Sequence, residues 1–275
     1  MDSSPLALQA HGPVDGLPLV LLHAFPLDAR MWDDVVALLA GDVRVLTLDA
    51  PGFGASPGPG AVADALGRPA EPSLETYADA VAATLRGAGI ERAVVAGLSM
   101  GGYTLLALAE RHRGLLAAVG LLDTRADADG DEARGNRLAM AEAARTEGSV
   151  AVAGMLERLL GVSTLAGRDQ VVARVRGWLA EAPPAGIAWA QRAMAARPDR
   201  FTALEDLEVP GLVLRGAEDP VSPQDANEAM TRRLDAGAEL VVVPRAGHLS
   251  AVEDPAAVAD ALRRLHAQAA AHRAG

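Results

Sequence analysis

Short apolar runs alternate along this chain with longer segments of helical periodicity. The runs are rich in Val and Leu and almost continuously apolar, which is typical of strands buried on both faces of a parallel sheet. Alternation of this kind predicts an α/β fold with an open, doubly wound, mostly parallel sheet and right-handed crossovers. We expect strands at 19–22, 43–48, 93–96, 116–121, 212–214 and 240–243, and helices at about 31–39, 73–86, 100–113, 223–234 and 255–266.

Two stretches interrupt the alternation. Residues 52–72 are rich in Gly and Pro and lack sustained periodicity, so we expect a long surface loop there. Residues 125–201 contain no strand pattern, and their amphipathic stretches predict four helices. These helices are expected at about 137–145, 150–160, 170–179 and 186–196. We therefore predict an α/β core formed by residues 1–124 and 202–275, with a helical cap inserted at residues 125–201.

Composition limits the classes of partner. Half of the 275 residues are apolar, which is enough for a large core, and the chain has no cysteine for disulfides or thiolate chemistry. A formal net charge of −11 repels a phosphate backbone, so we expect no nucleic-acid partner. The first residues lack the features of a secretion signal, and no apolar run approaches the ~20 residues that span a bilayer. We expect a cytoplasmic protein with no membrane partner.

One motif combines a serine with glycines. The segment Gly97-Leu98-Ser99-Met100-Gly101-Gly102 follows the predicted strand 93–96 and precedes the predicted helix 100–113. A G-x-S-x-G turn in this context exposes the serine hydroxyl above the carboxyl edge of the sheet, and its small neighbours allow the sharp reversal of the backbone. The helix N-terminus also places positive potential near a developing anion. We therefore predict that Ser99 is a nucleophile.

A serine nucleophile needs a base and an acid. Of the six histidines, His248 follows the last predicted strand, where its loop would overhang the sheet edge that carries Ser99. The imidazole then needs a carboxylate that fixes its tautomer. The turn after the strand 212–214 offers two, Glu218 and Asp219. We favour Asp219, with Glu218 as the competing acid.

Acyl transfer also needs hydrogen-bond donors for the oxyanion of the tetrahedral intermediate. The backbone N–H of Met100, the residue after the nucleophile, is expected to be one. The other is expected from the loop His23-Ala24-Phe25-Pro26-Leu27-Asp28, which follows the first parallel strand. Pro26 has no N–H, so we assign the second donor to the backbone of Phe25, whose ring would face the acyl pocket.

With catalytic residues in the chain order Ser, Asp, His, the chain resembles the α/β-hydrolase fold family. It looks most similar to small serine esterases, to perhydrolases of the cofactor-free haloperoxidase-like group, and to enol-lactone hydrolases. The resemblance implies a twisted, mostly parallel sheet flanked by helices, a nucleophile elbow, a catalytic triad, an oxyanion hole and an inserted cap domain. It rests on residues 23–28, Asp49-Ala50-Pro51-Gly52-Phe53-Gly54-Ala55-Ser56, residues 97–102, Gly216-Ala217-Glu218-Asp219 and Gly247-His248.

The substrate pocket is expected near these motifs and on the cap helices. We assign it to Phe25, Arg125, Met140, Trp178, Trp189 and Leu249. Arg125 would pair with a substrate carboxylate, as an enol-lactone hydrolase needs, although a surface ion pair is the commoner role. Met155 and Met194 also lie on predicted cap helices, where packing is the simpler role for most Met and Trp side chains. No cluster has metal-ligand spacing, and we expect neither a metal nor a cofactor.

Together these expectations predict that the protein hydrolyses a small carboxylic ester or lactone through a Ser99 acyl-enzyme. In perhydrolase-like proteins a proline follows the oxyanion residue, as Pro26 does here, so the resemblance implies perhydrolysis with peroxide as a side activity. Two alternatives stay open: carbon–carbon bond hydrolysis of a diketone, and a ligand sensor of the same fold with slow turnover. The expected partner is a small-molecule ester or lactone, and an apolar face on the cap would allow a homo-oligomer.

Overall fold

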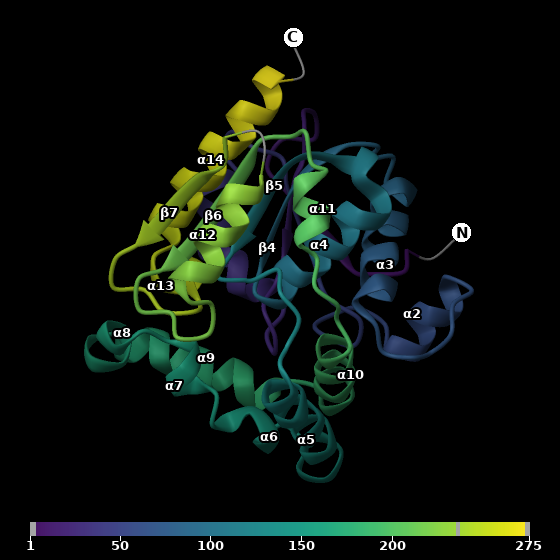
Figure 1. The fold of residues 1–275 in the computed structure, drawn as a ribbon, viewed down its shortest axis with the longest axis vertical. Coiled ribbons are helices and arrows are strands. Elements are labelled where there is room, and N and C mark those ends of the chain that lie inside the picture. The colour runs from purple at the N-terminus through teal and green to yellow at the C-terminus, as the bar shows by residue number, and fades with distance from the viewer. Residues whose placement is uncertain (1–3, 235–236, 273–275) are drawn as a thin grey trace.

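A seven-stranded sheet forms the centre of the computed structural model, which describes residues 4–234 and 237–272 (Figure 1). Its strands lie in the order β1-β3-β2-β4-β5-β6-β7, and only the β1–β3 pair is antiparallel. The strands are β1 (Leu8–His11), β2 (Leu19–Leu22), β3 (Val45–Leu48), β4 (Ala93–Leu98), β5 (Leu116–Leu122), β6 (Gly211–Gly216) and β7 (Glu239–Val243). The predicted α/β class with a mostly parallel sheet is confirmed. Residues 1–3, 235–236 and 273–275 of the predicted core lie outside the described residues.

All six predicted strands are present, with ends that differ by up to two residues. Every residue of β2, β3, β4, β5 and β6 is buried, which explains their continuous apolar character. Strand β1 is an addition to the prediction. It is a four-residue edge strand with a half-exposed pattern, and this leaves it without an apolar signal in the sequence.

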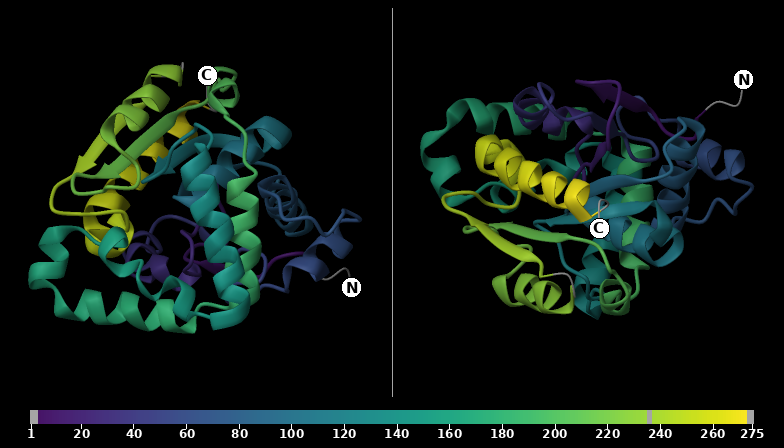
Figure 2. Two further views of the ribbon diagram at one scale, coloured as in Figure 1. Left: turned by 60° about the horizontal axis from the view of Figure 1, so that its bottom comes forward. Right: turned by 90° about the horizontal axis from the view of Figure 1, so that it is seen from above.

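Helices cover both faces of the sheet. On one face α1 (Asp33–Leu39) packs against the long α14 (Pro255–His272), and the short helices η1 (Ala29–Trp32) and α13 (Ser250–Glu253) lie beside them. On the other face lie α3 (Leu74–Gly87), α4 (Met100–His112), η2 (Arg113–Leu115), α11 (Phe201–Glu205) and α12 (Gln224–Arg233), as the two views of Figure 2 show. The side chain of Ser73 accepts a hydrogen bond from the Thr76 N–H and so caps α3.

The expected surface loop at residues 52–72 needs a correction, because it contains helix α2 (Pro59–Ala65). Pro59 occupies the start of this helix, where its fixed φ and missing N–H are favourable. Val62 and Ala63 are buried, so packing rather than a periodic pattern stabilises this short element.

Seven helices lie between β5 and β6, and the first six of them form a segment that we call the insertion. They are α5 (Asp131–Glu147), α6 (Val150–Ala153), α7 (Leu156–Leu159), α8 (Val162–Gly167), α9 (Asp169–Glu181) and α10 (Pro184–Ala195). In Figure 1 they lie together at the bottom, beyond one end of the sheet. Four helices were expected; the second of them is divided at Gly154 into α6 and α7, and α8 is additional.

The strand order reverses direction beside β2. From β2 the chain passes to β3 on one side, and after α3 it returns to β4 on the other side. The carboxyl ends of β2 and β4 are therefore neighbours, with Leu22 paired to Gly97. Ligands of open α/β sheets bind outside such a switch point. Here the loop that contains Phe25 and the turn that contains Ser99 meet at it.

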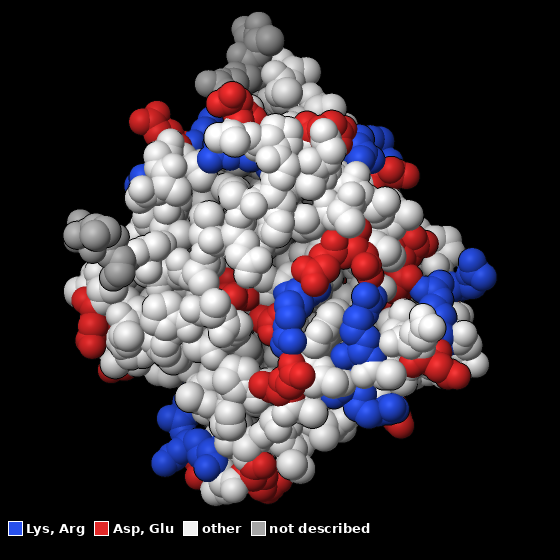
Figure 3. All heavy atoms as spheres, turned by 180° about the vertical axis from the view of Figure 1, so that it is seen from behind, with Lys and Arg blue, Asp and Glu red and all other residues white. Residues whose placement is uncertain are grey.

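The surface mixes charges of both signs. On the face shown in Figure 3, acidic and basic side chains lie next to one another. The carboxylate of Asp79, which is buried, contacts Arg68, Arg111 and His112 together. Among the helices of the described residues, none is both long and apolar enough to cross a membrane.

Candidate active site

Ser99 lies in a strained turn between β4 and α4. Its φ of 54° and ψ of −110° are rare for a residue with a side chain and are typical of functional sites. The flanking glycines make room for this turn: a Cβ on Gly97 would lie 2.2 Å from the Gly101 carbonyl carbon, and one on Gly101 would lie 2.2 Å from the Leu22 oxygen. The hydroxyl of Thr124 donates to the Ser99 carbonyl oxygen over 2.9 Å and holds the turn against β5.

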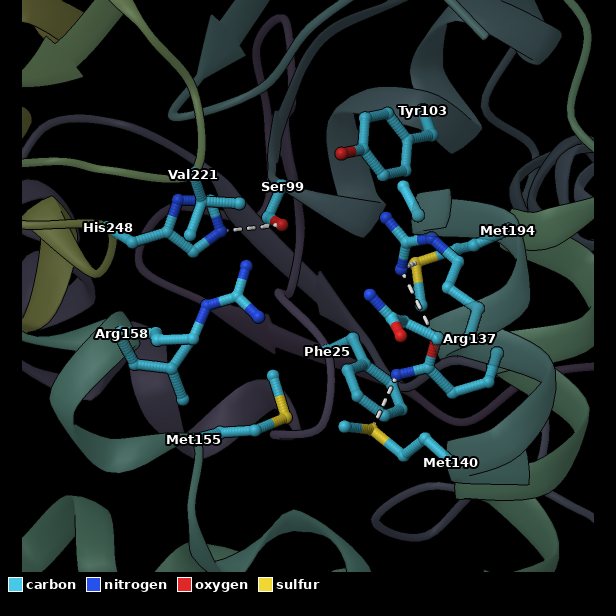
Figure 4. A pocket seen from close by; sticks show the side chains of 14 residues that line it. Phe25, Ser99, Tyr103, Arg137, Met140, Met155, Arg158, Met194, Val221 and His248 are labelled. Carbon is cyan, nitrogen blue, oxygen red and sulfur yellow. Dashed lines mark hydrogen bonds between the residues drawn. The ribbon is translucent and has the colours of Figure 1, made fainter. Parts of the chain in front are cut away.

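Three predicted catalytic side chains form a hydrogen-bonded row. The Ser99 Oγ lies 2.8 Å from His248 Nε2, and His248 Nδ1 lies 2.9 Å from Asp219 Oδ2 (Figure 4 shows the first contact). All three residues are buried. Asp219 is fixed in turn by the N–H groups of Val221 and Ser222, which donate to its Oδ1 over 2.7 and 3.2 Å. The carboxylate therefore orients the imidazole with Nδ1 protonated and Nε2 free to accept the serine proton.

The surroundings change the proton affinities of this row. Burial alone would lower the pKa of His248, but the Asp219 carboxylate, together with Asp123 and Glu253, outweighs burial and the net pKa is raised above 6.5. Burial alone would raise the pKa of Asp219, but the His248 ring and the donors around the carboxylate lower it. The imidazolium is thus stabilised, which is what a base needs when it takes the serine proton.

Glu218, the competing acid, points elsewhere. Its carboxylate accepts hydrogen bonds from the backbone N–H and the hydroxyl of Ser163 over 2.9 and 2.5 Å. These donors lower its pKa. Of the two acids in this turn, Asp219 contacts the His248 ring and Glu218 contacts the insertion.

The loop after β2 is braced by a buried histidine. His23 Nδ1 donates to the Ala24 carbonyl oxygen over 2.9 Å, and its Nε2 accepts from the Ala50 N–H over 2.8 Å. Burial lowers the pKa of His23, so the neutral ring matches these two partners. In the described part of the chain the N–H groups of Phe25 and Met100 have no protein acceptor. These two predicted oxyanion donors are therefore available at the switch point.

A cavity of about 180 Å³ opens in front of Ser99 and His248 (Figure 4). Its walls come from the core on one side and from α5, α7 and α10 of the insertion on the other. The lining residues are Phe25, Ser99, Tyr103, Ala133, Asn136, Arg137, Met140, Met155, Arg158, Leu159, Gln191, Met194, Val221 and His248. A cavity of this size suits a small molecule rather than a polymer.

Two residues predicted for the substrate pocket line this cavity, Phe25 and Met140. Met155 and Met194 line it as well, although packing was the simpler expectation for them. Their thioethers give the cavity a flexible apolar wall.

Contrary to the prediction, the other four residues assigned to the pocket lie outside the lining of this cavity. The Arg125 guanidinium pairs with Asp127, with Nε 2.7 Å from Oδ1, so the surface ion pair is what the structure contains. Trp178 lies on α9, a helix that contributes no wall, and Trp189 is buried on α10 away from the cavity. Leu249 is completely buried. Helical periodicity identifies an apolar face but not the element that it contacts.

Sequence reasoning missed the polar lining of the cavity, which includes Tyr103, Arg137, Arg158 and Gln191. One signal for Arg158 was present. It lies three residues after Met155, and residues at this spacing share a helix face. Both side chains point into the cavity in Figure 4.

Sequence reasoning also missed a buried acid that joins the insertion to the loop of His248. Glu253 is 3 % exposed, and its two oxygens accept from the N–H groups of Gly247 and Gly161, each over 2.8 Å. Gly247 precedes His248, and Gly161 lies between α7 and α8. A Cβ on Gly247 would lie 2.2 Å from the Gly161 nitrogen, so the two backbones touch. Burial raises the pKa of Glu253.

A second missed acid, Asp123, lies near Asp219 and His248 and directly follows β5. Its Oδ1 accepts from the Gly216 N–H over 2.7 Å, and its Oδ2 hydrogen-bonds the Ser250 hydroxyl. Burial, reinforced by the nearby Asp219, raises its pKa to about 8. A lone aspartate after a strand carries no sequence signal for such a position. Among the described residues, no three His, Asp or Glu side chains gather as a metal site would require.

Comparison with known proteins agrees with this architecture. A family model described as "Alpha/beta hydrolase family" matches residues 19–261. The chain is 28 % identical to the 3-oxoadipate enol-lactonase 1 of Acinetobacter baylyi over 91 % of this chain and 88 % of that protein. Among solved structures it is similar to a thermophilic esterase from Thermogutta terrifontis with malate bound, at 38 % identity and a TM-score of 0.86 over 95 % and 94 % of the two chains. It is also similar to the enol-lactonase from Burkholderia xenovorans, at 28 % identity and a TM-score of 0.83 over 94 % and 95 %. The chain therefore belongs to the α/β hydrolase family.

Proposed function

We propose that this hydrolase cleaves small carboxylic esters or lactones through an acyl-enzyme on Ser99. The observation that carries the proposal is the row Ser99–His248–Asp219, with contacts of 2.8 and 2.9 Å, at the floor of a small cavity. The relatives named as an esterase and as enol-lactonases support the same class of reaction.

The reaction proceeds in two halves. Ser99 Oγ attacks the substrate carbonyl carbon while His248 Nε2 takes its proton, and the N–H groups of Phe25 and Met100 stabilise the oxyanion. The tetrahedral intermediate collapses, the alcohol leaves with the proton from His248, and the acyl group stays on Ser99. A water molecule then attacks the acyl carbon and gives a proton to His248. The second tetrahedral intermediate releases the acid as the bond to Ser99 Oγ breaks and Ser99 takes that proton back from His248. Hydrogen peroxide in place of water would release a peracid, which is the proposed perhydrolase side reaction.

Hydrolysis of p-nitrophenyl esters from C2 to C12 by the wild type and by Ser99→Ala tests the proposal. We expect an optimum at short acyl chains because the cavity is small, and a loss of at least about 10⁴-fold in kcat for the variant. Ser149→Ala is the matched control, since Ser149 lies on the insertion and its side chain forms no cap hydrogen bond. An initial burst of p-nitrophenol would report the acyl-enzyme.

Three outcomes would change the proposed function. Full activity in Ser99→Ala would refute the serine mechanism. A wild type that hydrolyses no ester of the series would refute general esterase activity, and lactone or diketone substrates would be tested next. A single burst without further turnover would favour a ligand sensor.

A further inference from the structure

The cavity carries an excess of positive charge. Two of its lining residues are arginines, Arg137 and Arg158, and none is acidic. Figure 4 shows Arg158 on the His248 side of the cavity and Arg137 on the side of Tyr103 and Met194. A cleft lined by charge of one sign concentrates ligands of the opposite sign.

The charge on the Arg137 side is only partly balanced. Asp129 pairs with Arg137 over 2.5 Å and also with the buried Arg197 over 2.7 Å, so one carboxylate serves two guanidinium groups. The carboxylate of the neighbouring Asp127 forms an ion pair with Arg125. One positive charge therefore remains in this cluster.

Arg158 has no acidic partner among the described residues: no carboxylate oxygen lies within 4.0 Å of its guanidinium. Its side chain extends from α7 into the cavity, toward the space between His248 and Phe25. The Asp219 carboxylate does not neutralise it, because that group is already occupied by His248 Nδ1 and by the donors of Val221 and Ser222. A free guanidinium fork thus faces the reacting end of the cavity.

We propose that Arg158 is a specificity-determining residue that binds a carboxylate carried by the substrate, so that this enzyme acts on short esters or lactones bearing an anionic group. Guanidinium forks match carboxylates in a bidentate geometry, and such charged hydrogen bonds are among the strongest in proteins. The cavity of about 180 Å³ keeps that carboxylate only a few bonds from the ester. The inference rests on the proposed function for its reaction, but it makes a separate claim about binding.

Matched substrate pairs test this inference. Monomethyl glutarate carries its carboxylate on the acyl side and 4-acetoxybutanoate carries it on the alcohol side, and each is compared with its neutral carboxamide analogue. We expect the wild type to prefer at least one carboxylate over its amide by about 10-fold or more in kcat/KM. Arg158→Gln should reduce this preference by about 10- to 100-fold, mainly through KM, and leave kcat/KM for the amides within about 3-fold. Arg158→Lys should retain part of it.

Arg125→Gln is the control, because Arg125 is also an insertion-side arginine but lies outside the cavity. Its preference for carboxylates should equal that of the wild type. A wild type without a preference, or a preference that Arg158→Gln leaves unchanged, would overturn the inference. A loss of preference in Arg125→Gln equal to that in Arg158→Gln would overturn the assignment to Arg158.

A binding measurement separates this inference from the proposed function. Calorimetric titration of Ser99→Ala with monomethyl glutarate, 4-acetoxybutanoate and the two amides needs no turnover. Tighter binding of at least one carboxylate than of its amide, lost in Ser99→Ala/Arg158→Gln, supports the anion site even if no ester is hydrolysed. Equal binding of acid and amide in both pairs would refute it even if hydrolysis through Ser99 is established.

Discussion

Replacing Glu253 with glutamine tests whether the insertion positions His248, the proposed base. The carboxylate joins Gly161 of the insertion to Gly247 of the histidine loop through two hydrogen bonds of 2.8 Å. Glutamine has the same shape, but its single amide oxygen accepts from only one of these N–H groups. Its NH₂ group then faces the other N–H, which stays buried without an acceptor.

The expected loss of stability follows from this one unpaired N–H group. A buried N–H without a partner costs about 1–3 kcal/mol. For a chain of this size 1 kcal/mol corresponds to roughly 2–4 °C, so we expect Glu253→Gln to lower Tm by about 2–12 °C. Because His248 follows Gly247 directly, a small displacement of the loop should also lower kcat, by up to about 100-fold for a shift near 1 Å.

Thermal unfolding and ester hydrolysis at pH 8 measure both effects. Glu239→Gln is the matched control: Glu239 is exposed on β7, and its ion pair with Arg264 should contribute less than about 1 kcal/mol. If Glu253→Gln lowered Tm but left kcat unchanged, Glu253 would stabilise the fold without positioning His248. A Glu253→Gln variant with the Tm and kcat of Glu239→Gln would refute the reasoning altogether.

Three further predictions follow from the site. The acid limb of the pH profile of kcat/KM should have its midpoint above 6.5, because the net pKa of His248 is raised and only the neutral ring acts as a base; Asp219→Asn should move the midpoint down and lower kcat by about 10⁴-fold. The pKa of Asp123 rises from 3.8 to about 8 on folding, so between these values the folded state holds a proton that the unfolded state has lost, and the protein loses stability as pH rises through that range. The fall in Tm between pH 5 and 9 should therefore be smaller in Asp123→Asn than in the wild type. Gly101→Ala would place a Cβ 2.2 Å from a backbone oxygen of β2 and should cost about 1–3 kcal/mol or more in denaturant unfolding, whereas Gly114→Ala, which has open space, should not.

The parts of the molecule that were predictable from the sequence depend on local rules. Each buried strand is a continuous apolar run because both of its faces are covered. The turn around Ser99 is visible because only glycine fits at 97 and 101, where a Cβ would overlap backbone atoms. The predicted triad residues follow β4, β6 and β7, and parallel strands bring their carboxyl ends to one edge of the sheet.

The parts that were not predictable depend on contacts between distant segments. Nothing local distinguishes Trp178, which lies off the cavity wall, from Met155, which forms part of it; the packing of whole helices decides which face meets the core. Buried acids present the same difficulty. Glu253 looks like any helical glutamate until Gly161, 92 residues away, is placed against it. Strand β1 likewise forms because it pairs with β3, since its own residues carry no strand pattern.

The proposed catalytic row and the proposed anion site come from different parts of the fold. Ser99, Asp219 and His248 follow strands whose order fixes their spacing, while Arg158 and the three methionines that line the cavity come from the insertion. Changes on α7 should therefore alter which ester is preferred and leave the 2.8 Å contact between Ser99 and His248 intact. The exception is the junction at Gly161, where Glu253 ties the insertion to the histidine loop. Substitutions there should change selectivity and turnover together, because the same carboxylate holds Gly161, which follows α7, and Gly247, which precedes His248.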